Sequence, residues 1–243
     1  MLNISIILIE PENAGNTGAI CRSMKNFDFK DLILINPQFD TESSELRNRA
    51  KWANDLVDNI RIIKKYDSKT IKKLKKDFDY IIATTARLGR DYNVLRSPIT
   101  PRQLAEKLSD IDRKSKSLIK IAILIGREGS GLNNEEISTA DFTVTIPTSK
   151  KYGTMNISHA TTIILYEIFS ILSQENILSH ITPISEKEKE QMIKILEDKL
   201  LKMHFNTEEK RNTQRIVWKK LIGKSFLSKR EAYALMGFLK KIK

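Results

Sequence analysis

The sequence contains one cysteine, Cys21, and this scarcity excludes an intramolecular disulfide. No apolar run reaches the roughly 20 residues that a membrane-spanning helix needs. The apolar stretch from Met1 to Ile9 is too short for a secretory signal and lacks its basic leader. No grouping of His, Cys and acidic residues has the spacing of a metal site. These absences favour a reduced, cytoplasmic protein with neither a membrane segment nor a bound metal.

The charge is strongly basic and unevenly distributed. Lys and Arg number 42 against 30 Asp and Glu, which gives a formal net charge of +12. Between Lys210 and Lys243, eleven Lys or Arg stand against one acid, Glu231, so this segment alone carries +10. A basic segment of this size predicts a polyanionic partner, either nucleic acid or an acidic membrane surface. Lysine-rich surfaces that serve only solubility are the alternative.

Short apolar, β-branched runs alternate with helical patterns over the first 172 residues. Several runs are apolar throughout, as strands covered on both faces are. The alternation predicts an α/β fold whose mostly parallel sheet carries helices on both faces. The expected strands are 4–9, 32–35, 60–63, 80–83, 121–125 and 142–146, and the expected helices are 18–27, 43–52, 68–76, 101–108, 133–139 and 161–171.

The pattern changes after Ser173, where the strand signals end. We therefore expect an α/β domain over residues 1–173, a linker over 174–186 and a small all-α extension over 187–243. Helices are expected at 186–203, 208–222 and 228–242, with Gly223 ending the second. Ser185 with Glu188, and Ser228 with Glu231, have the spacing of a capping box.

Aromatic residues are interleaved with the basic residues of this extension: Trp218, Phe226, Tyr233 and Phe238. Their helical spacing favours the core of a small bundle, although aromatic side chains can also stack on bases. The basic residues around that core would then face a nucleic-acid backbone. The expected RNA contacts are Lys210, Arg211, Arg215, Lys219, Lys220, Lys224, Lys229 and Arg230.

Three clusters of small polar residues follow or lie near the strand-like runs, at residues 16–22, 126–132 and 152–160. Ligands of parallel sheets bind outside the carboxyl ends of the strands, so the three clusters are expected to form one site. Glycines allow close backbone approach, and a helix start rich in Thr, Asn and Ser offers hydrogen-bond donors. The glycine spacing matches neither the dinucleotide fingerprint nor a Walker loop, which argues against a nucleotide-dependent oxidoreductase.

Four side chains in these clusters carry specific expectations. Arg22 lies near the start of an expected helix, where the dipole disfavours a cation, which indicates an anion-facing role. Glu128, at the tip of a glycine-rich turn, is expected either to pair with a cation or to be an ordinary surface acid. Cys21 is expected to be a small buried residue rather than a nucleophile. His159 is expected to be a polar, partly buried helix residue.

Together the clusters resemble the three motifs of the TrmH-type branch of the SPOUT methyltransferases, and are closest to its TrmJ-type members. The motifs lie at residues 10–22, 124–136 and 146–160, and residues 83–87 also fit. The resemblance covers about residues 3–172. It implies a C-terminal trefoil knot, S-adenosylmethionine as cofactor, and a homodimer with the site at the subunit interface. It also implies 2′-O-methylation of the ribose of nucleotide 32, cytidine or uridine, in the tRNA anticodon loop.

The resemblance also assigns site residues. Arg22 is interpreted as a fixed cation that stabilises the developing alkoxide, because a guanidinium stays protonated in proteins. The proton would leave through a substrate phosphate or a water. The implied catalytic residues are Asn16, Arg22, Glu128, Thr154, Asn156 and Ser158, and the implied cofactor-binding residues are Thr84, Thr85, Gly126, Glu128, Gly131, Ile146, Pro147, Met155 and Asn156.

One departure from the family pattern concerns the third motif. Residues 150–154 read Lys-Lys-Tyr-Gly-Thr where many members have a Pro-Glu-Tyr-Pro-Ser-like run. Thr154 keeps a hydroxyl, and the two lysines add positive charge that favours RNA. The alternatives to a tRNA nucleotide 32 enzyme are a SPOUT 2′-O-methyltransferase acting on rRNA or another tRNA position, and a non-catalytic RNA-binding relative.

Overall fold

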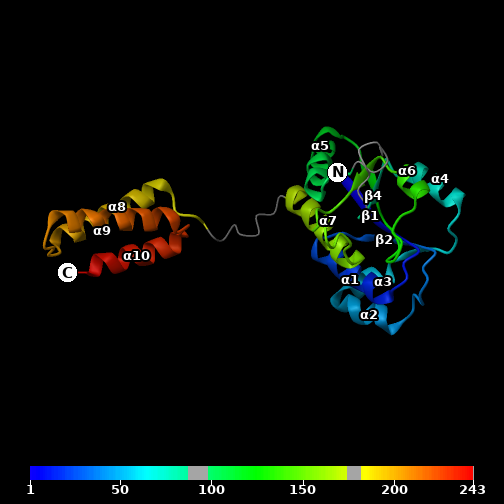
Figure 1. Cartoon of the computed structure of the whole chain (residues 1–243), viewed down its shortest axis with the longest axis horizontal. Helices are drawn as coiled ribbons and strands as arrows, with labels where there is room; N and C mark the ends of the chain where they lie inside the picture. Colours follow the sequence, from blue (N-terminus) through cyan, green and yellow to red (C-terminus); the bar gives the residue numbers. More distant parts are fainter. Residues whose placement is uncertain (87–97, 174–181, 243) are drawn as a thin grey trace. The chain divides into compact units, whose positions relative to one another are not determined.

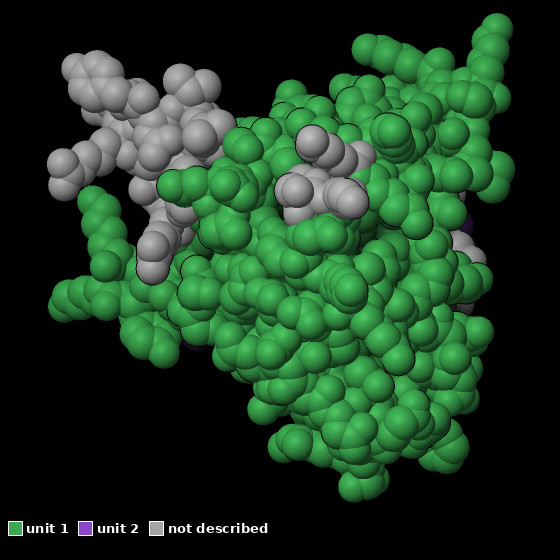
Figure 2. Space-filling view, turned by 90° about the vertical axis from the view of Figure 1, so that its right-hand side faces the viewer, with its two compact units in different colours: residues 1–174 green, residues 175–243 purple. Residues whose placement is uncertain are grey.

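The computed structural model describes residues 1–86, 98–173 and 182–242 (Figure 1). The chain divides into two units, Met1–Gln174 and Glu175–Lys243. Figure 2 shows the surface of the first unit in green. Most of the expected linker, 174–181, and Arg87 of the fourth matching segment lie outside the described residues. Across the described residues, no helix is long and apolar enough to cross a membrane.

The first unit is built on a parallel sheet with the strand order β3-β2-β1-β5-β4-β6. β1 and β5 form its centre and pair in register from Leu2 with Ile119 to Leu8 with Ile125. All strand pairings within the described sheet are parallel, which confirms the predicted architecture. The strands are β1 (Leu2–Ile9), β2 (Asp31–Ile35), β3 (Arg61–Ile63), β4 (Tyr80–Thr84), β5 (Ile119–Ile125) and β6 (Phe142–Val144).

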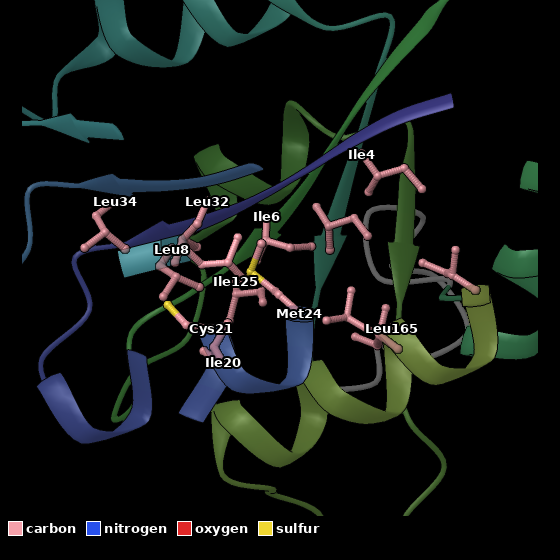
Figure 3. Packing of buried hydrophobic residues seen from close by; sticks show 14 of the residues in the cluster. Ile4, Ile6, Leu8, Ile20, Cys21, Met24, Leu32, Leu34, Ile125 and Leu165 are labelled. Carbon is pink, nitrogen blue, oxygen red and sulfur yellow. The ribbon is translucent and has the colours of Figure 1, made fainter. Parts of the chain in front are cut away.

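Helices cover both faces of this sheet, because successive strand residues point to opposite sides. On β1, Ile6 and Leu8 pack toward α1 and α7, whereas Ile7 and Ile9 pack toward α4 and α6. Figure 3 shows Met24 of α1 and Leu165 of α7 beneath the strands. The first face carries α1 (Ala14–Asn26), α2 (Ser44–Ala50), the short 3-10 helix η1 (Lys51–Ala53), α3 (Asn54–Asp58), α5 (Pro101–Lys114) and α7 (Ile157–Leu172); the second carries α4 (Ser68–Asp77) and α6 (Asn134–Ser138).

Two helices begin four residues earlier than the sequence pattern predicts. α1 begins at Ala14 because the Asn13 side chain accepts the backbone N–H of Asn16. α7 begins at Ile157 because Asn156 caps it in the same way. Asn156 belongs to the third polar cluster and Asn13 lies three residues before the first, so the first turns of both helices lie at the site. The short α3 was not predicted. α7 packs against both α1 and α5. The trefoil knot implied by the family resemblance stays a prediction.

The second unit is a bundle of three helices, α8 (Glu186–Lys202), α9 (Glu208–Lys224) and α10 (Lys229–Lys241). Both predicted capping boxes are present, at Ser185 and Ser228. In the first, hydrogen bonds from the Ser185 hydroxyl and backbone lower the pKa of Glu188 to about 2. Gly223 lies inside α9 and does not end it, contrary to the prediction.

The aromatic core predicted for this bundle is wrong for three of its four members. Phe226 is 98% exposed, Tyr233 57% and Phe238 62%, and only Trp218 packs against the core. The interior is already filled by aliphatic and methionine side chains that the helical spacing did not single out. These are Ile184, Met192, Leu196, Leu200, Ile222, Ala232, Met236 and Leu239.

An ion cluster fixes the ends of β1 and β5 to α6. Arg127 Nε donates to Glu10 Oε2 at 2.7 Å, and its Nη2 donates to Glu136 Oε1 at 3.0 Å. Glu136 is fully buried and also accepts from the Tyr66 hydroxyl. Burial alone would raise the pKa of Glu10, but hydrogen bonds from Asn36 and Arg127 outweigh it and hold that pKa below its ordinary value.

Removing the cation of this cluster is expected to destabilise the first unit strongly. Arg127→Met leaves Glu136 buried without its charged partner, which costs about 3–5 kcal/mol of unfolding free energy in urea titrations. The matched control is Arg113→Met, which removes an exposed pair with Asp110 and costs about 0–1 kcal/mol. Equal losses for both variants contradict this account.

The pH dependence of stability follows from the same cluster. Since folding lowers the pKa of Glu10, its contribution to the free energy of unfolding is full above pH 4.5 and is lost as the pH falls through the lower folded value.

Candidate functional site

The Glu128 carboxylate joins the loop after β5 to the segment after β1. It accepts the backbone N–H of Glu12 at 2.9 Å and that of Asn13 at 3.2 Å. It also accepts Asn16 Nδ2 at 3.2 Å. Among the described residues Glu128 therefore has no cationic partner, and it is not an ordinary surface acid, so it fits neither role expected of it. Its charge is held by amide donors at the beginning of α1, where the helix dipole favours an anion.

A chain of side-chain hydrogen bonds continues from Asn16 to the third cluster. Asn156 Nδ2 donates to Asn16 Oδ1 at 3.0 Å. Asn156 Oδ1 accepts from both the backbone N–H and the hydroxyl of Ser158, at 2.8 and 2.7 Å. The path from Glu128 through Asn16 and Asn156 to Ser158 connects segments more than 100 residues apart in sequence. The predicted convergence of the three clusters is confirmed.

A cavity of about 240 Å³ adjoins this chain. Its wall combines apolar side chains, hydroxyl groups and the glycine-rich loop after β5. Eight of the residues assigned to the site line it: Thr84, Thr85, Gly126, Glu128, Gly131, Ile146, Thr154 and Met155. Pro147 and Asn156, which were assigned to cofactor binding, are not among the lining residues, and Asn156 bonds Asn16 beside the cavity.

The glycine-rich loop closes tightly on itself. Gly131 N donates to the Arg127 carbonyl at 3.0 Å, and Gly131 has a left-handed φ of +71°. A Cβ on Gly126 would lie 2.2 Å from the Gly131 carbonyl carbon and 2.3 Å from Leu132 N. A side chain at Gly126 would therefore force the loop open.

Arg22 is the catalytic assignment that neither joins this chain of hydrogen bonds nor lines the cavity, whereas Thr154, outside the chain, does line the cavity. It is the ninth residue of α1, in the third turn, so the argument from the dipole of a helix start does not apply. Asn16 and Ser23 face α7 and its cap, and Ser23 bonds Thr162 at 2.6 Å.

The other side of α1 faces α2. A Cβ on Gly18 would lie 2.3 Å from the Leu46 carbonyl oxygen, and Lys25 bonds the Trp52 carbonyl at 2.8 Å. Arg22 is about one turn from both Gly18 and Lys25, so it lies on the α2 side and is exposed.

Two further expectations have clear outcomes. Cys21 is fully buried, and burial raises the pKa of its thiol to about 12, which confirms a small core residue rather than a nucleophile. His159 is exposed, not partly buried as expected. Among the described residues, no group of three or more His, Cys, Asp or Glu side chains could hold a metal ion.

Sequence reasoning missed the residues that support the site. Asn13 caps α1, and Glu10, Arg127 and Glu136 hold the loop ends together. A signal was available for Glu136, because it follows Asn133 by three residues in a capping box. No local pattern indicates the pairing of Glu10 with Arg127, since 117 residues separate them.

Comparisons with known proteins agree with the motif resemblance. The profile of the SpoU rRNA Methylase family matches residues 3–166. The chain is 35% identical over 241 residues to the tRNA (cytidine-2′-O-)-methyltransferase TrmJ of Methanocaldococcus jannaschii, covering 99% of this chain and 100% of the relative. It is 28% identical to the protein of the same name from Sulfolobus acidocaldarius, covering 99% and 94%.

The crystal structure of TrmJ from Z. mobilis ZM4 shares the fold, with a TM-score of 0.67, 24% identity and 97% coverage of both chains. The match of the profile over most of the chain and the identity of the full-length relatives point to one family. The chain belongs to the SpoU rRNA methylase family, whose members are S-adenosylmethionine-dependent RNA methyltransferases.

Proposed function

We propose that this methyltransferase modifies the ribose 2′-hydroxyl of tRNA, at nucleotide 32 of the anticodon loop. The observation that carries the proposal is the chain of hydrogen bonds from Glu128 through Asn16 and Asn156 to Ser158, beside a cavity with a glycine-lined wall. Both full-length relatives are named tRNA (cytidine-2′-O-)-methyltransferases, which supports tRNA as the substrate and cytidine as the nucleoside.

The cavity fits S-adenosylmethionine. Ile146 and Met155 offer apolar surface to a planar adenine, and Thr84 and Thr85 add polar groups at the same wall. The space that a Cβ on Gly126 would enter is taken by the loop backbone, whose N–H and C=O groups can read the edge of a base. When bound, this cofactor supplies the methyl group from a sulfonium centre.

The protein residues must orient the ribose and manage one proton and one developing charge. Asn156 is fixed on both ends of its amide, by Asn16 and Ser158, so it and the nearby Thr154 are suited to position the acceptor. Glu128 anchors this arrangement from the far end of the chain. Arg22 acts as a fixed cation near the acceptor oxygen, and the proton leaves through a substrate phosphate or water.

The exposed position of Arg22 supports a site shared between subunits. Within one chain it lies on the α2 side of α1, turned away from the face that carries Asn16. In a homodimer, an exposed guanidinium on one subunit can serve the cavity of the other. We therefore propose that Arg22 completes the site of the partner subunit.

The basic extension supplies a second, electrostatic contact to tRNA. Seven of its eight assigned cations are exposed, whereas Arg211 is half-buried. Three of the eight have acidic partners: Arg211 with Glu208, Arg215 with Glu197 and Lys229 with Glu188. The remaining five, which form no ion pair with any described acid, are Lys210, Lys219, Lys220, Lys224 and Arg230. These five are the strongest candidates for contacts with tRNA phosphates. The protein is proposed to act in the cytoplasm.

Labelled S-adenosylmethionine and unmodified tRNA test the reaction directly. The expected product carries one methyl group on the 2′-oxygen of nucleotide 32, located by mass spectrometry of nuclease fragments. The matched control is the same tRNA with a 2′-deoxynucleotide at position 32, which should take up no label. If the label appears in rRNA or at another tRNA position instead, the proposed target is wrong. Failure to bind S-adenosylmethionine in calorimetry indicates a non-catalytic RNA-binding relative.

Subunit mixing tests the role of Arg22. Arg22→Ala and Asn156→Ala are each expected to lower kcat about 100- to 1,000-fold, as loss of a transition-state donor does. When the two inactive variants are mixed, each heterodimer regains one site with both groups, and activity returns. Absence of recovery in verified heterodimers shows that both residues act within one chain. Near-native rates for Arg22→Lys argue against a role specific to the guanidinium.

Removing positive charge from the extension is expected to weaken tRNA binding. Deletion of residues 187–243, or the full-length variant with Lys219, Lys220 and Lys224 changed to Gln, should raise Kd strongly and flatten its salt dependence, while S-adenosylmethionine binding stays intact. The matched control changes Lys114 and Lys116 of the first unit to Gln. Unchanged tRNA affinity in both variants removes the extension from the proposal.

A further inference from the structure

Trp52 is 93% exposed, although tryptophan carries a large apolar surface. It lies in η1 between Ala50 and Ala53, which are 0% and 1% exposed. The backbone on either side is therefore anchored in the core while the indole ring stands in water. Leaving so much apolar surface exposed forgoes the free energy that normally drives a tryptophan inside, which indicates a partner that covers it.

The backbone at Trp52 is held in place by contacts with Lys25 of α1. Lys25 Nζ donates to the Trp52 carbonyl at 2.8 Å and pairs with Asp55 at 2.6 Å. Lys51, just before Trp52, has a left-handed φ of +54° and caps α2, its backbone N–H donating to the Arg47 carbonyl. A ring presented on a fixed backbone loses little conformational freedom when a ligand stacks on it.

Exposed cations stand near Trp52 in the sequence and on the neighbouring helix α1. Arg22, Arg49 and Lys51 are exposed, and none of them forms an ion pair with a described acidic group. The two acids of α3 already have cationic partners, Asp55 with Lys25 and Asp58 with Arg47. One further acid, Glu45 of α2, is exposed and forms no ion pair with a described cation. Three cations therefore stand against one acid among the unpaired charges of α1, α2, η1 and α3, and this excess complements a phosphate backbone.

The arrangement along α1 places Arg22 within this surface. Arg49 lies over Gly18, where an added Cβ would come within 2.8 Å of the Arg49 Cβ, and Lys25 reaches the Trp52 carbonyl. Arg22 lies between these two contacts, about one helical turn from each. Figure 1 shows α1, α2 and α3 grouped on the same side of the sheet.

A nucleobase fits this surface better than a second copy of the protein does. Protein interfaces have cores of several apolar side chains, but on α1, α2, η1 and α3 Trp52 is the one large apolar side chain exposed, while the exposed Tyr166 belongs to α7. A single-stranded nucleic acid needs one aromatic face for a base and cations for the flanking phosphates.

We infer that Trp52 is a stacking platform for an unpaired base of the RNA substrate, with Arg49 and Lys51 against the neighbouring phosphates. The inference rests on the proposed function in one respect, which is that the stacked base neighbours the ribose served by Arg22. It assigns to the methyltransferase unit an RNA contact of its own, separate from the basic extension.

Binding of unmodified tRNA tests the platform in the full-length protein. Trp52→Ala is expected to raise Kd about 10- to 100-fold, as loss of one stacked base does, whereas Trp52→Phe stays within about threefold of wild type. Leu118→Ala is the matched control, because Leu118 is also exposed but precedes β5, at the opposite end of the strands from the site. Wild-type affinity in Trp52→Ala overturns the inference. A Trp52→Ala variant whose assembly has a different molar mass in sedimentation equilibrium also overturns the inference and assigns Trp52 to a contact between copies of the chain.

Fluorescence gives a readout that does not depend on methylation. The chain has two tryptophans, so Trp218→Phe leaves Trp52 as the single tryptophan emitter. Oligocytidine RNA is expected to quench this emission saturably and to shield Trp52 from acrylamide, and absence of both effects overturns the inference. Quenching without any tRNA methylation leaves the platform standing and rejects the proposed function. Methylation of nucleotide 32 without quenching rejects the platform alone.

Discussion

The arrangement of the site depends on the Glu128 carboxylate and the three donors that it accepts. One carboxyl group holds the backbone of Glu12 and Asn13 and the side chain of Asn16, and Asn16 in turn fixes Asn156. Hydrogen bonds to a charged acceptor are stronger than neutral ones, and each link orients the next. Because the two asparagines use both ends of their amides, the chain has one direction, and Ser158 at its end is positioned by a charge three side chains away.

The same end of the sheet carries a second, separate cluster with a structural role. Arg127 and Glu128 are adjacent, yet Arg127 faces Glu10 and Glu136 while Glu128 faces α1. The ion cluster fixes where the strand ends lie, and the amide chain uses that fixed frame to place polar groups beside the cavity. Division of these tasks between neighbouring residues explains why a short glycine-rich loop can both support the fold and line a binding site.

Local sequence patterns predicted the strands well. A short run that is apolar throughout is typical of a strand that is covered by helices on both faces of its sheet. The patterns predicted helix beginnings less well. Asn13 was read as part of the first motif and Asn156 as part of the third cluster, but each is a cap that lengthens its helix by a turn. The bundle of the second unit shows a further limit. Spacing alone favoured an aromatic core, whereas Phe226, Tyr233 and Phe238 remain exposed, since methionine and aliphatic side chains fill the interior.

The sequence by itself determined the parallel α/β architecture, the helical basic extension and the family, because apolar periodicity, charge and short motifs are local properties of the chain. Only the tertiary structure decided which polar groups meet. The bonds between Glu10 and Arg127, Glu128 and Asn16, and Asn16 and Asn156 join segments more than 100 residues apart. It also decided that Arg22 faces α2 and that Trp52 stands in water, since the side on which a helical residue lies depends on what packs against the helix.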